Sequence, residues 1–235
     1  MKDRKIISAG MDDASTGAMN AARRGARPYV IGLTGSIASG KSAVGELLER
    51  RGYMVLDADV VSRRLSKTGG EAYQAIVDTF PEAVEVSKDG QPQLARKKLA
   101  ELVFADPKKL TQLEQILHPL IGAVRQDFYR AAHQAGAELV FIMVPLLFEK
   151  NIDQECDATM VVVSNSAARK ARALARPGMT ESLLEKIQQQ QMTDKEKMAR
   201  ADIVISNDGS LADLERHVDG AVAQMLARLV ATKGG

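Results

Sequence analysis

The stretch "YVIGLTGSIASGKSAVGELLERR", residues 29–51, decides the fold of this 235-residue chain. It begins with an apolar run from Tyr29 to Thr34, continues through a loop of small residues, and ends with apolar residues at helical spacing. The run is apolar throughout rather than alternating, which is typical of a strand buried on both faces of a parallel sheet. The stretch therefore predicts a buried strand, a tight loop and an amphipathic helix, in that order.

The loop "GSIASGKS", Gly35 to Ser42, fits the pattern G-x-x-x-x-G-K-[ST]. Its glycines let the backbone curl so that successive N–H groups point at phosphate oxygens, and a helix that begins near Lys41 adds the positive end of its dipole. We expect Lys41 to reach the β- and γ-phosphates of a nucleotide and the Ser42 hydroxyl to ligate Mg²⁺. The pattern occurs by chance in roughly one chain in a hundred of this length. The flanking strand and helix are the context that supports a nucleotide site.

Four more apolar runs read as strands: "YMVLDAD" at 53–59, "ELVFIMV" at 138–144, "ATMVVVS" at 158–164 and "DIVISN" at 202–207. Helical patterns separate the runs, which makes the chain an α/β protein with a five-stranded parallel sheet. The gap between the second and third runs is too long for one crossover helix, so we predict a helical insertion that covers the sheet edge. A polar stretch broken by Pro177-Gly178 predicts a helical hairpin on the surface. The boundaries are then core 28–64, 138–165 and 201–235, insertion 65–137, and lid 166–200.

Residues 1–27 are rich in Gly, Ser, Ala, Asp and Arg and have no apolar stripe, so we expect a disordered tail or a start-site artefact. The net charge of +2, from 32 basic and 30 acidic residues, creates no global field that would attract nucleic acid or a membrane. The single cysteine, Cys156, excludes an intrachain disulfide and is expected to be a packed side chain. No apolar run reaches the roughly 20 residues that span a bilayer. These features favour a cytoplasmic protein.

The second apolar run ends in two acids, Asp57 and Asp59. Parallel strands end at the same edge of the sheet, so both carboxylates are expected near the γ-phosphate. A phosphate acceptor would be repelled there, whereas a hydroxyl acceptor would gain a proton acceptor and an orienting hydrogen bond. We therefore favour a hydroxyl acceptor. The alternative, a helix N-cap after the strand, fits one of the two acids equally well.

Three arginines in the predicted hairpin, Arg169, Arg172 and Arg176, recur at i, i+3 and i+7 and share one helix face. One interpretation is a solvated basic face. Another is a lid whose arginines close over ATP and neutralise the charge that develops during transfer. A third is nucleic-acid binding, which the aromatic content of 4% and the absence of Trp disfavour.

These motifs, together with "DADVVSR", "HPLI" at 118–121, "VPLLFE" at 144–149 and "ADIVISNDG" at 201–209, resemble the dephospho-CoA kinase family from residue 29 to the C-terminus. The resemblance implies a P-loop NTPase three-layer fold with a helical CoA-binding insertion and a helical lid. It implies transfer of the ATP γ-phosphate to the 3′-hydroxyl of the ribose of dephospho-coenzyme A, the last step of coenzyme A synthesis. The implied small molecules are ATP, Mg²⁺ and dephospho-CoA.

The resemblance also assigns roles to residues. Asp59 would be the base that faces the 3′-hydroxyl, and Lys41 and Arg172 would be catalytic with it. Asp57, Asp59, Arg63, Arg96 and His118 would line the acceptor site. The ATP site would comprise Gly35, Ala38, Ser39, Gly40, Lys41, Ser42, Ala43, Arg172, Arg176, Asn207 and Gly209, with Ser42 on the metal and the last two near adenine. On the bare sequence, His118 before a proline is a helix-junction residue, and "VPLLFE" is a buried strand end whose Glu149 opens into solvent.

Four positions depart from the usual family pattern: Ser36 and Ala38 stand where glycines often occur, Ala43 where a threonine is common, and Arg169 where a glutamine is common. Ala38 is tolerable if its backbone does not need a positive φ. None of the departures removes a group that the chemistry needs.

Two alternatives to this function remain. The near one is another nucleoside or nucleotide kinase of the same fold. The distant one is a nucleotide-dependent switch or nucleic-acid-binding NTPase, in which ATP hydrolysis would respond to a partner or to RNA. We expect a monomer or weak homo-oligomer without nucleic-acid or membrane partners.

Overall fold

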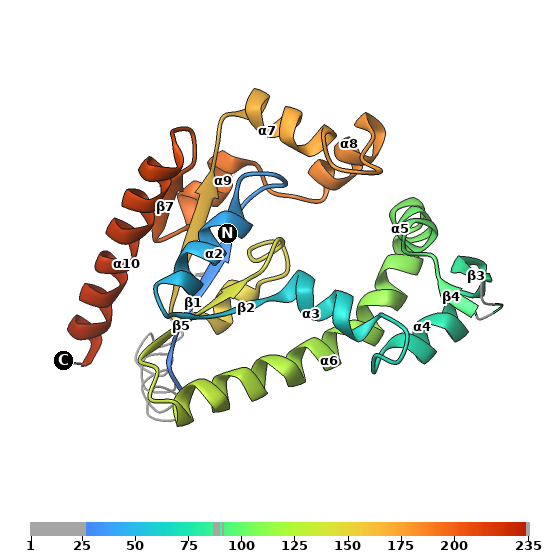
Figure 1. Ribbon diagram of the computed structural model, residues 1–235, viewed down its shortest axis with the longest axis horizontal. Coiled ribbons are helices and arrows are strands. Elements are labelled where there is room, and N and C mark those ends of the chain that lie inside the picture. Colours follow the sequence, from blue (N-terminus) through green and yellow to red (C-terminus); the bar gives the residue numbers. More distant parts are fainter. Residues whose placement is uncertain (1–26, 87–89, 91, 234–235) are drawn as a thin grey trace, which may run out of the picture.

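The computed structural model describes residues 27–86, 90 and 92–233, and Figure 1 shows a sheet with helices around it and a helical arm that extends from one side. The prediction for residues 1–26 lies outside the described residues. Arg27, which the predicted tail includes, belongs to the folded part, because its guanidinium donates to the Asp157 carboxylate at 2.7 Å.

The sheet is formed by the five predicted strands in the order β2-β5-β1-β6-β7, all parallel. The strands are β1 (Tyr29–Thr34), β2 (Met54–Asp57), β5 (Leu139–Met143), β6 (Ala158–Val163) and β7 (Ile203–Ser206). Strand β1 is fully buried and lies in the middle, with two strands on either side. The α/β prediction and all five strands are therefore confirmed.

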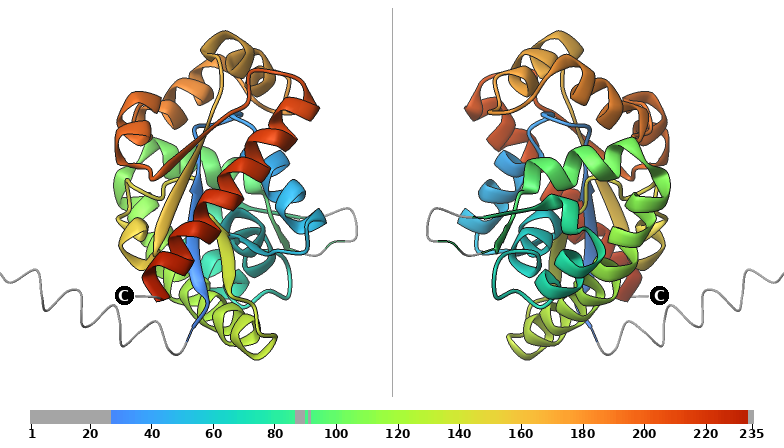
Figure 2. Two further views of the ribbon diagram at one scale, coloured as in Figure 1. Left: turned by 90° about the vertical axis from the view of Figure 1, so that its left-hand side faces the viewer. Right: turned by 90° about the vertical axis from the view of Figure 1, so that its right-hand side faces the viewer.

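Helices cover both faces of the sheet, as a three-layer fold requires. On one face, α2 (Lys41–Arg50) and α10 (Leu211–Lys233) pack against alternate strand residues such as Ile31 and Leu33. On the other, the carboxyl half of α6 (Pro107–Gln134) and the turn around η2 (Ile152–Glu155) pack against residues such as Val30. Figure 2 shows α10 in front of the strands from one side and the insertion helices in front from the other.

The predicted insertion has a hydrophobic core of its own and does not simply cover the sheet edge. After α3 (Ala58–Leu65), the chain forms α4 (Tyr73–Thr79), η1 (Pro81–Ala83), β3 (Val84–Val86), β4 (Pro92–Leu94), α5 (Arg96–Ala105) and α6. Val61 and Leu65 of α3 join Ile76, Phe80 and Leu99 in this second core. The antiparallel pair β3–β4 was not predicted, because its strands are three residues each and largely exposed.

The predicted lid contains three short helices: α7 (Ser166–Leu174), α8 (Glu181–Gln189) and α9 (Asp194–Arg200). Each begins at a side-chain cap, from Asn165, Thr180 and Thr193 respectively. Such caps satisfy N–H groups that the first helical turn leaves open. The turn through Pro177-Gly178 separates α7 from α8, as the sequence predicts.

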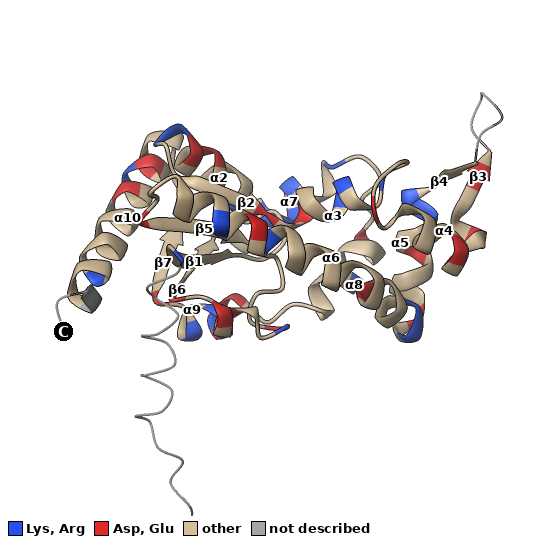
Figure 3. Cartoon of the chain, turned by 90° about the horizontal axis from the view of Figure 1, so that it is seen from below, with Lys and Arg blue, Asp and Glu red and all other residues tan. Residues whose placement is uncertain are grey.

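Basic and acidic residues are interspersed along the core and the arm, in agreement with the small net charge (Figure 3). Among the described helices, none combines the length and the apolar character that crossing a membrane requires. Cys156 is half-buried and packs against a hydrophobic cluster, as predicted, and burial raises the pKa of its thiol to about 12.

Candidate active site

A cavity of about 560 Å³ lies where the phosphate loop, the start of α3 and the lid meet. It joins Lys41 to Asp59, the two side chains on which the kinase interpretation depends most. Its wall combines loop, lid and insertion residues: Gly35, Ser36, Ile37, Ala38, Ser39, Gly40, Lys41, Ser42, Ala43, Asp59, Phe104, Pro145, Leu146, Arg172, Arg176, Ile187, Gln190, Gln191 and Asn207.

The phosphate loop is held in its curled shape by a positive φ at Gly40 and by a hydrogen bond from Asn207. Gly40 has a φ of +106° and caps α2 without a side-chain hydrogen bond, which leaves the first N–H groups of the helix for an anion. The Asn207 amide donates to the carbonyl of Ser39 at 2.8 Å. A Cβ on Gly40 would lie 2.0 Å from Nδ2 of Asn207, so a side chain at position 40 would collide with this brace.

Ala38 does not meet the condition under which an alanine is tolerated without strain at this loop position. Its φ is +60°, so it does occupy the left-handed region that favours glycine. A non-glycine residue there costs on the order of 1–2 kcal/mol. The methyl group packs against Ala173 and Leu184 of the lid, in a small apolar cluster that links loop and lid. This contact offsets part of the strain.

The two acids after β2 differ in what they bind. Oδ1 of Asp57 accepts hydrogen bonds from the N–H groups of Asp59 at 2.8 Å and Val60 at 3.2 Å. The N-cap alternative is therefore confirmed for Asp57. Asp59 lies in the first turn of α3 with its side chain in the cavity. The geometry leaves Asp59 as the carboxylate that can meet a substrate.

Protein atoms surround Lys41 and Asp59 on most sides, although the Asp59 side chain is open to the cavity. Desolvation by burial lowers the pKa of Lys41, and the carboxylates of Asp59 and Asp57 oppose this shift. Desolvation raises the pKa of Asp59, while the charge of Lys41 opposes the shift and that of Asp57 adds to it. Arg63 and Arg176 also lie near enough for their charge to act on Asp59. The cavity thus holds opposite charges whose mutual attraction offsets only part of the free-energy cost of removing them from water.

Of the three arginines of the predicted hairpin, Arg172 binds the phosphate loop directly and Arg169 reaches it through Asp194. Arg172 donates from Nε to the Ala38 carbonyl at 3.1 Å and from Nη2 to the Ser164 hydroxyl at 2.5 Å. Arg169 forms an ion pair with Asp194, which also accepts from the hydroxyl of Ser36. Arg176 lines the cavity. The interpretation of a solvated basic face is therefore wrong for Arg169, which is half-buried, whereas Arg172 and Arg176 are exposed.

Several residues that the resemblance assigns do not line this cavity. Arg96 donates to the carbonyl of Arg63 at 2.7 Å, which ties α5 to α3. His118 is exposed on α6. The helix continues through Pro119, so the helix-junction interpretation of His118 is wrong. Gly209 is exposed in the turn before α10, outside the cavity wall.

The segment "VPLLFE" places Pro145 and Leu146 in the cavity wall, but its Glu149 does not open into solvent. Glu149 accepts from Nζ of Lys197 at 2.7 Å and from the N–H of Met192 at 2.7 Å. The side chains of Lys197 and Glu149 are 0% and 10% exposed. The expectation failed because the partner lies 48 residues further on.

Sequence reasoning missed several residues at this site, among them Phe104, Gln190, Gln191 and Asp194. Oε1 of Gln191 accepts from the N–H of Ile37 at 3.0 Å, so the glutamine run at 188–191 meets the phosphate loop. That run was the signal that could have indicated the contact. Phe104 and Asp194 stand in segments whose pattern does not distinguish them from ordinary helical residues.

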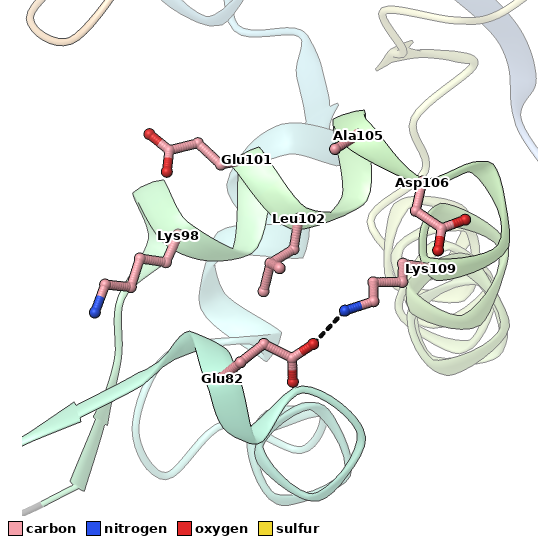
Figure 4. Close-up of a pocket in the computed structure, with 7 residues that line it drawn as sticks. All are labelled: Glu82, Lys98, Glu101, Leu102, Ala105, Asp106 and Lys109. Carbon is pink, nitrogen blue, oxygen red and sulfur yellow. Dashed lines mark hydrogen bonds and ion pairs between the residues drawn. The ribbon is translucent and has the colours of Figure 1, made fainter.

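A second cavity, of about 370 Å³, lies within the insertion between η1, α5 and the start of α6 (Figure 4). The two lysines that line it form ion pairs with glutamates: Lys109 with Glu82, which Figure 4 shows, and Lys98 with Glu85. It contains none of the residues assigned to nucleotide or acceptor. Within the described residues there is no cluster of three or more His, Cys, Asp or Glu side chains that could hold a metal.

Comparison with known proteins agrees with this geometry. The family model described as CoaE, dephospho-CoA kinase, matches residues 29–213. The dephospho-CoA kinase of Novosphingobium aromaticivorans is 40% identical over 200 residues, which cover 85% of this chain and 94% of that protein. That of Thermus thermophilus is 38% identical over 208 residues, covering 88% and 96%. The crystal structure of TT1252 from Thermus thermophilus superimposes with a TM-score of 0.70 at 36% identity and covers 84% of this chain and 98% of that one. The chain therefore belongs to the dephospho-CoA kinase family.

Proposed function

We propose that this chain transfers the γ-phosphate of ATP to the 3′-hydroxyl of the ribose of dephospho-coenzyme A, giving coenzyme A and ADP. The observation that carries the proposal is that Lys41 and Asp59 line one cavity, at the carboxyl ends of β1 and β2. In the transfer, O3′ of the acceptor bonds to the γ-phosphorus, the bond from that phosphorus to the β–γ bridging oxygen breaks, and the hydroxyl proton passes to Asp59.

The roles of the other cavity residues follow from charge and position. Lys41 stabilises the γ-phosphate, and the loop N–H groups from Gly35 to Ala43 bind the remaining phosphate oxygens. Arg172 and Arg176 neutralise charge on the transferring group when the lid closes. Asp57 orients Asp59 by capping α3. Because the transition state is loose, positioning and charge neutralisation contribute more than proton removal.

Ser42 fits the role of a Mg²⁺ ligand. Mg²⁺ prefers oxygen ligands and is commonly held by one or two protein groups together with substrate phosphates and water. Ser42 lies in the cavity wall at the start of α2, next to Lys41. Ser42 would hold the ion, which would supply positive charge next to the phosphates of ATP.

The acceptor side of the proposed site includes Arg63 on α3, Arg96 on α5 and His118 on α6. Arg96 donates a hydrogen bond to the carbonyl of Arg63 and so ties α5 to α3. We place the ATP base on the opposite side, toward Asn207 and Gly209, which follow β7. We further propose that the enzyme acts in the cytoplasm as a monomer or weak homo-oligomer, which sedimentation of the purified chain would test.

The experiment that tests the proposal is an assay of ADP formation with ATP and Mg²⁺, with and without dephospho-CoA. We expect ADP release that depends on dephospho-CoA and is accompanied by coenzyme A. Parallel reactions with nucleosides, nucleoside monophosphates and RNA separate the alternatives. Equal or faster turnover with a nucleoside or monophosphate would contradict the proposed acceptor, and hydrolysis stimulated by RNA alone would favour the switch interpretation.

A further inference from the structure

Phe104 in α5 differs from every other phenylalanine of the chain. The sequence contains five, and the other four pack in hydrophobic clusters: Phe80 in the insertion core, Phe141 on one face of the sheet, and Phe128 and Phe148 on the other. Phe104 belongs to none of these clusters, is half-buried, and lines the active-site cavity. Its ring is thus available to a ligand, at the cost of exposing apolar surface to water.

The ring stands on the acceptor side of the cavity. The phosphate loop follows β1 in the middle of the sheet, while β2 and β7 form the two edges. Asp59 and the insertion that carries Phe104 follow β2, and Asn207 follows β7. Figure 1 shows α3 and α5 on the opposite side of the sheet from β7 and α10. Because the attacking and leaving oxygens lie roughly in line through the γ-phosphorus, acceptor and ATP approach from opposite sides.

The chemistry of the acceptor supplies a partner for this ring. The 3′-hydroxyl and the adenine of dephospho-CoA are attached to the same ribose, so an acceptor whose O3′ meets Asp59 must place its base on the neighbouring wall. Of the residues that line the cavity, Phe104 is the one with an aromatic ring. Purine bases stack on aromatic rings with a gain of about 1–3 kcal/mol per base.

We propose that Phe104 stacks on the adenine of dephospho-CoA and thereby determines specificity for a purine-bearing acceptor. The inference rests on the proposed function and adds to it a residue that selects the base. The stacking contact forms with the acceptor alone and does not involve the base of ATP.

The test is the steady-state kinetics of Phe104→Ala, Phe104→Leu and Phe104→Tyr in the full chain, with ATP and dephospho-CoA varied separately. Phe104→Ala should raise KM for dephospho-CoA about 10-fold, within the range of about 5- to 150-fold that base stacking provides. KM for ATP should stay within about twofold of wild type, since we place the adenine of ATP on the opposite side of the cavity, away from Phe104. Phe104→Tyr keeps the ring and should restore the wild-type KM, and Phe104→Leu should fall between the two.

Leu102→Ala provides the matched control, because Leu102 lies on the same helix but packs against the insertion core. It should lower the melting temperature at least as much as Phe104→Ala while leaving KM for dephospho-CoA near the wild-type value. A dephospho-CoA analogue with hydrogen in place of the base gives a second readout. Wild type should bind this analogue no better than Phe104→Ala does, because the contact that distinguishes the two proteins is then gone.

Three results would overturn the inference: an unchanged KM for dephospho-CoA in Phe104→Ala, a rise in KM for ATP of the same size, or an effect of Phe104→Ala that persists with the base-free analogue. Each of these requires a wild-type chain that phosphorylates dephospho-CoA. If wild type forms no ADP in response to that acceptor, the proposed function itself is wrong and the inference is lost with it.

Discussion

Asp57 and Asp59 show how two identical side chains, two residues apart, take different tasks. The strand ends at Asp57, and its side chain turns back to cap the helix that follows. Asp59 is already helical and projects into the cavity. The sequence left open which acid would be the cap, because either position could begin a helix. The hydrogen bonds from Asp59 and Val60 to Asp57 decide it.

Asp59→Asn should reduce kcat by about 10²–10⁴-fold, the usual contribution of a positioned proton acceptor. The amide has nearly the same shape but cannot accept the proton. Binding of ATP, measured by titration calorimetry, should remain close to wild type, because Asp59 faces the acceptor. Asp57→Ala serves as the control for α3, since loss of the cap should cost about 1 kcal/mol of stability. An unchanged kcat in Asp59→Asn would remove this residue from the chemical step.

Asp59→Asn should also make the nucleotide-free chain more stable at neutral pH. The pKa of Asp59 is raised above its ordinary value of 3.8 in the folded chain, mainly by burial, so the ionised carboxylate destabilises the fold. The asparagine removes that charge. The gain in melting temperature should be present at pH 7, shrink as the pH falls through the raised pKa, and vanish below 3.8, where the wild-type carboxyl is also neutral in both states. A difference of constant size over this range, or none at pH 7, would contradict the assignment.

At the scale of elements, the lid is joined to the phosphate loop by contacts that come from the positions departing from the family pattern. Asp194 at the start of α9 bridges Ser36 of the loop and Arg169 of α7. Ala38 adds its methyl contact with α7 and α8. These contacts tie the lid to the phosphate loop in the nucleotide-free state.

Asp194→Asn should weaken the bridge and raise KM for ATP about fivefold, with a smaller effect on kcat. The magnitude corresponds to about 1 kcal/mol, reduced from the value for a charged hydrogen bond because the pair is partly exposed. Initial-rate kinetics with ATP as the varied substrate would measure it.

Thr193→Ala is the control for this change. It removes the side-chain cap of α9 without touching the bridge, and should lower stability by about 1 kcal/mol with KM for ATP unchanged. Equal effects of the two variants on KM would show that Asp194 acts only through the stability of α9. Non-additive effects of Ser36→Ala and Asp194→Asn on KM would support the bridge.

The elements themselves could largely be predicted from the sequence. All five sheet strands were found because a strand such as β5 is apolar along its whole length and lies between helical patterns. The helical hairpin of the lid was predicted from the turn at Pro177-Gly178, and in the structure the Thr180 hydroxyl caps its second helix, α8. The β3–β4 pair escaped because strands of three largely exposed residues carry no pattern of their own.

At the scale of the whole molecule, Lys197 and Glu149 join the lid to the sheet. Lys197 on α9 is fully buried and pairs with Glu149, which follows the wall residues Pro145 and Leu146. Nζ of Lys197 also lies 3.4 Å from the Pro145 carbonyl, which accepts from Thr34 at the end of β1 as well. A buried ion pair therefore connects the third lid helix to the central strand.

Lys197→Met should destabilise the chain by about 3–5 kcal/mol, because it leaves the Glu149 charge buried without its partner. Urea unfolding followed by circular dichroism would measure the change. The double variant Lys197→Met, Glu149→Leu should recover much of this loss, since a buried pair replaced by apolar residues is often neutral. If both variants are equally unstable, the pair contributes mainly through its hydrogen bonds to Met192 and Pro145.

The parts of the site that could not be predicted are those that depend on partners distant in the chain. Lys41 and Ser42 belong to a local motif and could be assigned from spacing alone. Glu149 could not, because its burial is decided by a lysine in the lid. Phe104 could not, because only the folded insertion shows that its ring faces the cavity rather than a core.

Position 40 illustrates a constraint with two independent sources. The backbone there has a positive φ, which only glycine adopts without a conformational penalty. The side-chain amide of Asn207 also occupies the place that a Cβ atom would take. A shorter side chain at position 207 would remove the steric clash but leave the backbone penalty. A negative φ at position 40 would remove the penalty but change the shape of the phosphate loop. No single compensating exchange can therefore rescue an alanine at this place, and Gly40→Ala should resist suppression by any change at Asn207.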